Sequence, residues 1–380
     1  MSTKEIAKKI TRALMVQWSR REFKIKMRKR SLYHIKKWKT NFVNLDERSI
    51  LSDSQKRAVQ EYWKSKFPVP STFTYQYHAF YTAATGHFDV HYIPDNLYYC
   101  LIDIRLNNRQ RAKAIDNKCL YAKVFPQAKQ PEIIAYRMEQ NWVDKDYCSL
   151  SEKELSELLD AEEELVLKIA NESMGGKGVF FISGSDKSNQ VFDLIKQNNK
   201  DVVIQKVLKQ HPELAKLNPD SVNTIRHLTF IENGKAKVYS SILRMGIDNS
   251  RVDNASSGGI TCGITSSGQL KPVAYAVTGK KYDLHPSSGI AFDSITVPSF
   301  EESIRFVERL HESFPLFRLI SWDIAIDENG EPLLIEPNLY VGELDFHQLN
   351  NGPLFGTDQE RILTEIAWNI PEEFTLRYGY

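Results

Sequence analysis

The segment SWDIAIDENGEPLLIEPN, residues 321–338, reads as two apolar strands around a polar turn. Apolar runs that flank an Asp-Glu-Asn-Gly turn are a strong signal for a β-hairpin. A loop over residues 327–332 places Asp323 directly opposite Glu336 on the partner strand. Because side chains two apart on a strand share a face, Asn338 then lies beside Glu336.

Three oxygen ligands would therefore converge on one face of this hairpin. Carboxylate and amide oxygens suit a hard cation, so Asp323, Glu336 and Asn338 are candidate ligands of Mg²⁺, which waters and nucleotide phosphates would complete. The alternative is a solvated hairpin whose acidic side chains merely face water. The hairpin alone does not decide between the two.

Composition sets the wider frame. The chain has 380 residues, 42% hydrophobic and 11% aromatic, which predicts two or three domains or subdomains with a sizeable core. No apolar run approaches the roughly 20 residues of a membrane span, and the N-terminus lacks the pattern of a secretory signal. Four widely spaced cysteines form no C-x-x-C pair, which disfavours zinc and disulfides and favours a cytoplasmic setting.

Charge is concentrated at the N-terminus. Residues 1–40 hold 14 Lys or Arg against two acidic residues, whereas the remainder has 36 basic and 46 acidic residues. The segment also has an apolar stripe with a spacing of four, formed by Ile6, Ile10, Leu14 and Trp18. A basic amphipathic helix of this kind can lie on an anionic membrane surface, which would place the protein at the inner face of the membrane.

Two alternatives stay open for this basic arm: a helix that docks on the chain's own acidic body, and an arm that binds another partner. Nucleic acid is not an expected partner, because the basic patch is confined to one end and no recognition motif follows it.

Local patterns divide the rest of the chain. Residues 41–95 are helical and then loop-rich, and residues 96–380 alternate short strands and helices, an α+β pattern. Capping boxes at Ser151 with Glu154 and at Ser299 with Glu302 predict two helix starts; the stripe expected to be buried in the second helix is Ile304, Val307, Leu310 and Phe314. Expected strands, besides the hairpin, are residues 164–170, 179–182, 202–207, 222–231 and 236–245.

The run LVLKIANESMGGKGVFFI, residues 165–182, predicts a strand, a glycine-rich loop and a second strand. Backbone amides at Gly175, Gly176 and Gly178 could approach phosphate oxygens, although a plain hairpin is the commoner outcome. Lys168 lies inside the apolar first strand, where its charge needs a partner such as a phosphate. The run is neither a P-loop nor a dinucleotide fingerprint.

Two arginines lie inside expected strands. Arg226 and Arg244 suit bidentate binding of phosphate or carboxylate, and the alternative is an ordinary ion pair. A small-residue loop with Asn254, Gly258 and Gly259 follows and allows close approach of a ligand, unless it is a plain turn.

These features occur in an order that resembles the ATP-grasp superfamily, and most closely the sugar-transfer-associated ATP-grasp proteins of bacterial polysaccharide biosynthesis. The most specific matches are NPDSVNTIRHLT, DNASSGGI and WDIAIDENGEPLLIEPN, with a later His347 and Gln348. The resemblance covers roughly residues 95–365. It implies two α+β subdomains that clasp ATP, the smaller at about residues 150–207, preceded by the basic helical segment.

The resemblance also implies roles for individual residues. Lys118 and Lys168 match the two ATP-phosphate lysines, Gly176 and its neighbours the phosphate flap, and Lys206 and Val207 the hinge that holds adenine. Gln205 stands where relatives commonly carry glutamate. The remaining matches are a metal triad of Asp323, Glu336 and Asn338, a phosphate- and oxyanion-binding Arg244 with Arg226, and substrate residues Asn254, Gly258, Gly259, His347 and Gln348.

The implied activity is that of an ATP- and Mg²⁺-dependent carboxylate–amine ligase that forms an acyl phosphate and modifies a sugar or polysaccharide precursor with an amino acid or related group. Such a reaction needs charge neutralisation and positioning more than a protein nucleophile. One alternative is a kinase for a sugar or sugar-lipid hydroxyl. Another is a non-catalytic ATP-binding scaffold of a polysaccharide-assembly complex.

Overall fold

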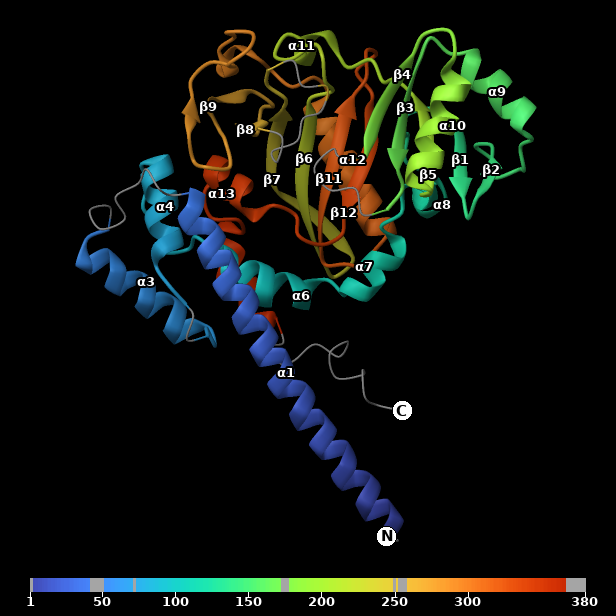
Figure 1. Ribbon diagram of the computed structural model, residues 1–380. Coiled ribbons are helices and arrows are strands. Elements are labelled where there is room, and N and C mark those ends of the chain that lie inside the picture. The colour runs from blue at the N-terminus through green and yellow to red at the C-terminus, as the bar shows by residue number, and fades with distance from the viewer. Residues whose placement is uncertain are drawn as a thin grey trace.

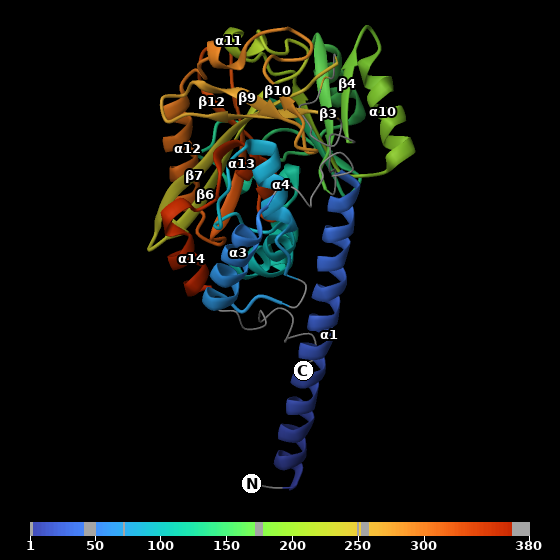
Figure 2. The ribbon, with the colours of Figure 1, turned by 90° about the vertical axis from the view of Figure 1, so that its left-hand side faces the viewer.

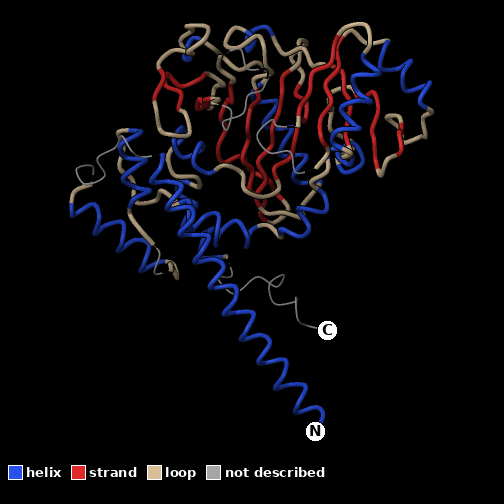
Figure 3. The backbone as a smooth tube through the Cα atoms, in the orientation of Figure 1, coloured by secondary structure: helices blue, strands red, loops and turns tan. Residues whose placement is uncertain are grey.

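The computed structural model describes residues 3–41, 51–70, 73–171, 178–248, 251 and 258–366. Two antiparallel β-sheets lie side by side with helices around them, and a long helix, α1, projects from the body (Figure 1). Strands gather in the sheets, while the helices that precede them in sequence lie below (Figure 3).

The smaller sheet has five strands in the order β2-β1-β5-β3-β4. One face of it packs on two helices, α9 and α10, through a core that contains Leu165, Leu167 and Ile204. The sheet takes in β1 and β2 and so begins before the expected start at about residue 150. Its elements are β1 Ile133–Met138, β2 Asn141–Val143, α9 Glu152–Asp160, β3 Glu164–Ile169, β4 Val179–Ser183, α10 Lys187–Asn198 and β5 Val202–Lys206.

The larger sheet has seven strands in the order β10-β9-β8-β7-β6-β11-β12. Strands that are consecutive in sequence are neighbours throughout, except that β11 pairs with β6 and thereby brings the hairpin of residues 321–338 beside it. The strands are β6 Thr224–Glu232, β7 Lys235–Met245, β8 Ile260–Ile264, β9 Leu270–Tyr275, β10 Lys281–Tyr282, β11 Leu319–Ile326 and β12 Pro332–Asn338.

The two faces of β11 have different environments because side chains alternate along a strand. Ile320, Trp322 and Ile324 point into the main core, which helix α12 (Phe300–Ser313) covers. Leu319 points to the other face and packs against the helical N-terminal region. Asp323 lies further along that second face and is buried. The same face is therefore apolar at one end of the strand and polar at the other.

The hairpin confirms the predicted pairing of its acidic residues. Asp323 lies opposite Glu336 in the β11–β12 ladder. The turn is one residue shorter than expected, because Ile326 pairs with Pro332, and an irregularity in the ladder after Asp323 restores the register. A β-bulge of this kind commonly lies next to functional sites.

Short helices cover the large sheet on the face that bears Asp323, at the apolar end of that face. They share a core with Leu228, Phe230 and Leu319 of the sheet. Helix α13 packs against β7, β8 and β9. The helical elements besides those already given are α3 Asp53–Lys66, α4 Gln76–Thr85, α5 Asp95–Leu97, η1 Tyr98–Ile102, α6 Asp103–Leu106, α7 Arg109–Ile115, η2 Lys118–Leu120, α8 Tyr121–Val124, α11 Pro212–Ala215, η4 Phe292–Ser294, α13 Leu344–Asn351, η5 Gly356–Asp358 and α14 Gln359–Glu365.

The predicted basic helix is present as α1, Thr3–Asn41. Its C-terminal part packs on the body, where Phe23 and Met27 form a small core with Cys100 and Ile104. Its N-terminal part extends away from the body in both views (Figures 1 and 2). Among the residues that the structure describes, no helix has the length and apolarity needed to cross a membrane.

One of the two predicted capping boxes is correct. Ser151 accepts a hydrogen bond from the Glu154 amide, and the Glu154 side chain bonds back to Ser151. At Ser299 the predicted helix start is correct, since α12 begins at Phe300, but the capping box is absent: Ser299 has a φ of 50°, in the left-handed region, and its side chain makes no capping hydrogen bond. The buried face of α12 is also rotated from the expected stripe: Phe306, Val307, Leu310 and His311 are buried, and Ile304 and Phe314 are half-buried.

Candidate functional site

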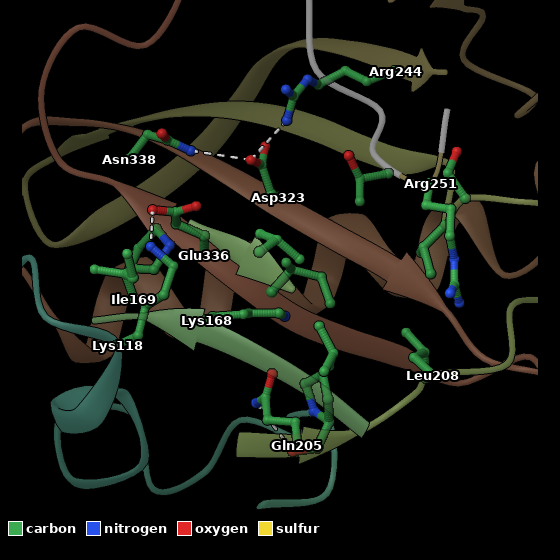
Figure 4. Close-up of a pocket in the computed structure, with 18 of the residues that line it drawn as sticks. Lys118, Lys168, Ile169, Gln205, Leu208, Arg244, Arg251, Asp323, Glu336 and Asn338 are labelled. Atoms are coloured by element: carbon green, nitrogen blue, oxygen red, sulfur yellow. Dashed lines mark hydrogen bonds and ion pairs between the residues drawn. The ribbon is translucent and has the colours of Figure 1, made fainter. Parts of the chain in front are cut away.

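A cavity of about 1770 Å³ lies between the two sheets. Its walls come from β3, β4 and β5 of the small sheet and from β6, β7, β11 and β12 of the large one. Figure 4 shows the polar side chains that both sheets turn into it. Residues 207–210 and 219–222, between β5 and β6, also line the cavity. This segment links the small-sheet wall to the large-sheet wall.

Asp323 is the centre of the large-sheet wall. The register places Arg226 of β6 opposite it, and Arg226 donates from Nε to Oδ1 and from Nη2 to Oδ2, both at 2.7 Å. Arg244 of β7 donates from Nη1 to Oδ2 at 2.9 Å. All three side chains are about 95% buried. A charged group at this depth requires such pairing, because an isolated buried charge is very costly.

The electrostatics of Asp323 follow from this pairing. Burial acts to raise the pKa of its carboxyl group, but the Coulombic attraction of Arg226 and Arg244 outweighs it and leaves the pKa below its ordinary value. Glu343 pairs with Nη1 of Arg226 from the loop after β12. The nitrogens of Arg226 are thus largely committed to carboxylates of the protein, which matches the ordinary ion pair considered for this residue from the sequence.

Glu336 and Asn338 lie beside this network on the edge strand β12. The Glu336 carboxylate is 29% exposed and accepts a hydrogen bond from Lys118 Nζ at 3.0 Å. Asn338 donates from Nδ2 to Asp323 Oδ2 at 3.4 Å. Its side-chain oxygen Oδ1 takes no part in this hydrogen bond. Lys118 begins the short helix η2. The Asn117 side chain caps this helix, because its Oδ1 accepts a hydrogen bond from the Cys119 N–H at 2.8 Å.

The small-sheet wall has fewer charges. Val166 and Lys168 of β3 alternate with core residues and face the cavity together with Phe181 of β4 and Gln205 of β5. Lys168 is half-buried, as expected for a lysine inside an apolar strand whose end reaches a cavity. Figure 4 places it between the two walls, on the same side of the cavity as Gln205.

Gln205 is buried, and its Nε2 is 3.4 Å from the carbonyl oxygen of Pro131. Among the described residues, its Oε1 has no hydrogen-bond partner. Lys206 and Val207 also line the cavity. The Lys206 amide already donates to the Glu132 carbonyl at 2.9 Å, so this N–H would have to leave that bond to reach a ligand.

Two predicted substrate residues do not reach the cavity. His347 and Gln348 have no exposed surface and are not among its lining residues. His347 Nδ1 shares a hydrogen bond with Ser240, and Gln348 bonds to both backbone groups of Ile93. The prediction of direct substrate contact was wrong, because this face of α13 packs inward and joins the large sheet to the N-terminal helices.

The small-residue loop is only partly described. Gly258 and Gly259 lie just before β8 and are not among the lining residues of the cavity. Asn254 lies outside the described residues, as do Gly175 and Gly176 of the glycine-rich loop. The roles predicted for these three residues stay predictions.

Sequence reasoning missed several residues of the cavity, and four of them are polar or charged residues near the predicted ones or at its edges. Arg251 forms a bidentate ion pair with Glu164 of β3 at 2.7 and 3.1 Å and stacks on Phe181. Asp116 is half-buried beside Lys118, and burial, followed by the charge of Glu336, raises the pKa of its carboxyl group. Tyr340 and Glu343 come from the loop after β12. The sequence analysis gave none of these residues a role, and the fold brings them together from separate segments: Asp116, Arg251, Tyr340 and Glu343.

The donor set of the large-sheet wall fits a hard cation. Glu336 offers a partly exposed carboxylate, Asn338 an amide oxygen, and Asp323 a carboxylate whose oxygens already accept bonds from two arginines. Within the described part of the chain, no cluster of three or more His, Cys, Asp or Glu residues could hold a metal. A cation here would therefore rely on two carboxylates, an amide and oxygens that come from a ligand.

A family model described as sugar-transfer associated ATP-grasp matches residues 102–361. Among solved structures, the N5-carboxyaminoimidazole synthetase of Staphylococcus aureus complexed with ADP is similar at a TM-score of 0.40 and 10% identity, over 65% of this chain and 54% of that one. The D-alanine–D-alanine ligase of Coxiella burnetii is similar at a TM-score of 0.39 and 11% identity, over 69% and 60%.

The biotin carboxylase domain of Hydrogenobacter thermophilus 2-oxoglutarate carboxylase, in complex with MgADP, ADP and bicarbonate, is similar at a TM-score of 0.41 and 12% identity, over 69% of this chain and 48% of that one. The chain spans about half the length of the first solved structure that it matches. No curated protein matches it.

Proposed function

The chain belongs to the sugar-transfer associated ATP-grasp family, and we propose that it is an ATP- and Mg²⁺-dependent ligase that joins a carboxylate to an amine. One observation carries this proposal. A single cavity between two sheets has lysines on one side and a carboxylate and amide set on the other, with Lys118 and Glu336 in direct contact across it. That arrangement suits a polyphosphate bound with a cation.

The proposed reaction has two steps. First, a carboxylate oxygen of the substrate attacks the γ-phosphorus of ATP, the bond to the β-phosphate oxygen breaks, and ADP leaves. An acyl phosphate remains. Second, the lone pair of an amine attacks the acyl carbon, phosphate leaves with its bonding electrons, and the amine loses a proton. Neither step needs a protein nucleophile, so charge neutralisation and positioning supply the catalysis.

The residues of the cavity divide these tasks in the proposal. Lys118 and Lys168 bind phosphate oxygens, and Arg244 holds the transferred phosphate and the developing oxyanion. Arg226 acts as a positioning residue, because its donors hold Asp323 and Glu343. Glu336, Asn338 and Asp323 would hold Mg²⁺, which neutralises phosphate charge when bound.

The nucleotide base would lie against the small sheet. That side is lined by Gln205, Lys206 and Val207. The side-chain oxygen Oε1 of Gln205 is a buried acceptor without a partner among the described residues. A buried polar atom of this kind costs stability unless a ligand completes it. The 6-amino group of adenine is a donor that would do so.

The volume of the cavity supports a second substrate. Sites for single small ligands typically measure about 300–1,000 Å³, and the cavity measures about 1770 Å³. Because the family is associated with sugar transfer, we propose that the acceptor is a sugar or polysaccharide precursor and that the transferred group is an amino acid or a related carboxylate.

We also propose a cytoplasmic setting at the inner face of a membrane. The reaction consumes ATP, and the four cysteines are free thiols, three of them buried. Such thiols fit a reducing compartment. Attachment to the membrane would come from residues 1–40.

The proposal is tested by trapping the intermediate. The purified protein is incubated with ATP, Mg²⁺, hydroxylamine and pools of amino acids or uronic acids, and hydroxamates are measured by mass spectrometry. An acyl phosphate yields a hydroxamate. In addition, heavy oxygen placed in the substrate carboxylate appears in the released phosphate, because one carboxylate oxygen leaves with it.

Two other outcomes would replace the ligase with an alternative. A stable phosphoester, formed without release of phosphate, would indicate a kinase acting on a sugar or sugar-lipid hydroxyl. Tight ATP binding without turnover in any pool would indicate an ATP-binding scaffold.

A further inference from the structure

Helix α1 carries most of the exposed large hydrophobic side chains among the described residues. Eight of the eleven large hydrophobic side chains that are exposed lie on it, and three lie elsewhere. Soluble proteins expose single hydrophobic residues routinely, but a concentration of them on one element marks an interaction surface. The eight residues are Ile6, Ile10, Leu14, Met15, Trp18, Ile25, Leu32 and Tyr33.

Six of these side chains form a single stripe. An α-helix turns by about 100° per residue, so Ile6, Ile10, Leu14, Trp18, Ile25 and Leu32 fall within an arc of about 120°. Their exposed fractions lie between 45% and 61%. We call this set the apolar stripe.

The body of the protein does not cover this stripe. The buried residues of α1 are Ser19, Phe23, Met27 and Ser31, each four apart and at most 6% exposed. Their direction lies about 140° around the helix from the stripe. The helix therefore has one face committed to the body and a second face that points away from it, which is mainly apolar from Ile6 to Trp18 and mixed with Arg21 and Arg28 beyond Trp18. Figures 1 and 2 show the N-terminal part of α1 clear of the body from two directions.

The charge around the stripe is strongly positive. Residues 1–40 carry 14 basic and two acidic residues, whereas the rest of the chain has an excess of acidic ones. Lys4, Lys8 and Lys9 are exposed and lie outside the arc of the stripe, whereas Arg21 and Arg28 are exposed and lie within it, beyond Trp18. Their long side chains can follow the helix surface and place their charges beside an apolar layer, which is how lysines behave at lipid interfaces.

We propose that α1 lies on the surface of an anionic lipid bilayer, with the apolar stripe inserted among the acyl chains and the lysines at the headgroups. The buried face of residues 19–31 fixes the body to the same helix, so the catalytic body is held at the membrane by packing, not by a flexible tether. This proposal is independent of the reaction at the cavity.

A second copy of the chain is a poorer occupant for the stripe. A coiled coil needs apolar residues at alternating spacings of three and four. Between Trp18, Ile25 and Leu32, which are seven apart, the intervening positions of that pattern are Arg21 and Arg28. Two such helices would also oppose like charges along their length. A nucleic acid would satisfy the lysines but leave the apolar stripe in water.

The test is sedimentation of the full chain with two kinds of vesicle, phosphatidylcholine alone and phosphatidylcholine with an equal part of phosphatidylglycerol. We expect binding to the anionic vesicles only. The variant with Ile6→Ser, Ile10→Ser, Leu14→Ser and Trp18→Ser should lose at least tenfold in affinity. The matched control, Leu284→Ser with Leu316→Ser, removes two equally exposed hydrophobic residues from the body and should bind normally.

Two further measurements distinguish insertion of the apolar stripe from attraction by charge alone and from a change in folding. The fluorescence difference between the parent protein and Trp18→Phe isolates Trp18 among six tryptophans, and it should shift to the blue with anionic vesicles. Thermal unfolding and nucleotide binding should be the same in all variants, because the changed side chains are exposed and lie outside the cavity.

Several results would overturn the proposal. One is that neither vesicle binds the protein; another is that the fourfold serine variant binds as well as the parent, which would mean attraction by charge alone. A third is a concentration-dependent dimer that the fourfold variant abolishes, since the stripe would then face a second copy. If the vesicle results hold while nucleotide binding is absent, the ligase proposal fails and the membrane proposal stands.

Discussion

The two walls of the cavity satisfy their polar groups in opposite ways. On the large sheet, Asp323 accepts hydrogen bonds from two buried arginines and an asparagine, and Arg226 also pairs with Glu343. On the small sheet, Gln205 lines the cavity, and its buried side-chain oxygen Oε1 has no hydrogen-bond partner among the described residues. The large-sheet wall pairs its buried charges with one another, and the small-sheet wall has a buried polar group that a ligand can complete.

This difference separates residues that build the site from residues that act through a ligand. A buried ion-pair network holds its geometry before a ligand arrives, because breaking it leaves an uncompensated charge in a low-dielectric environment. A half-buried lysine, or a buried but uncharged glutamine, costs less to change and affects the ligand more than the fold. Variants of the buried ion-pair network should therefore lose stability, and variants of residues that contact a ligand should lose binding or turnover.

The largest effect is expected for Asp323→Asn. The change leaves Arg226 and Arg244 buried without their shared carboxylate, and losing one partner of a buried pair costs about 3–5 kcal/mol. Chemical denaturation, measured without nucleotide or Mg²⁺, should show this loss in the free energy of unfolding. Asp193→Asn, which breaks an exposed pair with Lys196 on α10, should change it by less than about 1 kcal/mol. Equal values for the two variants would contradict the structural role.

The same carboxylate predicts a dependence of stability on pH. The pKa of Asp323 is lowered from its ordinary value of 3.8 in the folded protein. Its contribution to stability is therefore fully present above that ordinary value and is lost as pH falls through the lower, folded pKa. Denaturation curves from neutral to acidic pH should thus converge for the parent and Asp323→Asn. A gap that persists at the lowest pH would argue against the carboxylate as its cause.

Glu336→Gln should affect turnover more than folding. The glutamate is partly exposed on an edge strand and contacts Lys118, so the loss of its charge should leave the free energy of unfolding nearly unchanged. ATP turnover with Mg²⁺ should fall by roughly 100-fold or more, because charge stabilisation at the transferred phosphate is worth several kcal/mol. Glu331→Gln, in the turn of the same hairpin, serves as the control. Full activity in Glu336→Gln would remove the metal assignment.

Sequence reasoning was most successful where the site depends on one local element. The pairing of Asp323 with Glu336 followed from strand alternation and a turn signal, and a bulge absorbed an error of one residue in the loop. Lys118 and Lys168 came from the resemblance to a family, and the cavity contains both. Local pattern and family order therefore placed the residues of the hairpin and of the two lysine-bearing segments.

Sequence reasoning failed where the partner of a side chain is distant in sequence. Arg226 meets Asp323 because β6 and β11 are neighbours in the sheet, and nothing within either strand reveals that pairing. His347 looked like a substrate residue because the motif sits after the metal hairpin, but helix α13 turns it inward against Ser240. The orientation of a helix face depends on what packs against it, and local spacing does not contain that information.

On the small-sheet wall, Lys168→Met should weaken nucleotide binding while the fold persists. Methionine retains the aliphatic length of the side chain, and a charge-assisted hydrogen bond to a phosphate is worth roughly 1.5–3 kcal/mol. Calorimetry should show a 10- to 150-fold weaker affinity for ATP. Lys153→Met, an exposed change on α9, controls for the loss of a positive charge, and an unchanged affinity in Lys168→Met would contradict phosphate binding.

The smallest and most selective effect is expected at Gln205. If its carbonyl oxygen accepts from the 6-amino group of adenine, the parent protein should prefer ATP to inosine triphosphate, which carries an oxygen at that position and presents no donor there. Gln205→Leu removes the acceptor and should reduce this preference by about 2- to 10-fold, since one neutral hydrogen bond contributes about 0.5–1.5 kcal/mol. Gln205→Glu keeps an acceptor of the same reach and should retain the preference. The test is to measure the affinity of the parent protein and both variants for each nucleotide. A preference for ATP that survives in the leucine variant would contradict recognition by the Gln205 side chain. Base recognition would then be assigned to the backbone of residues 206–208.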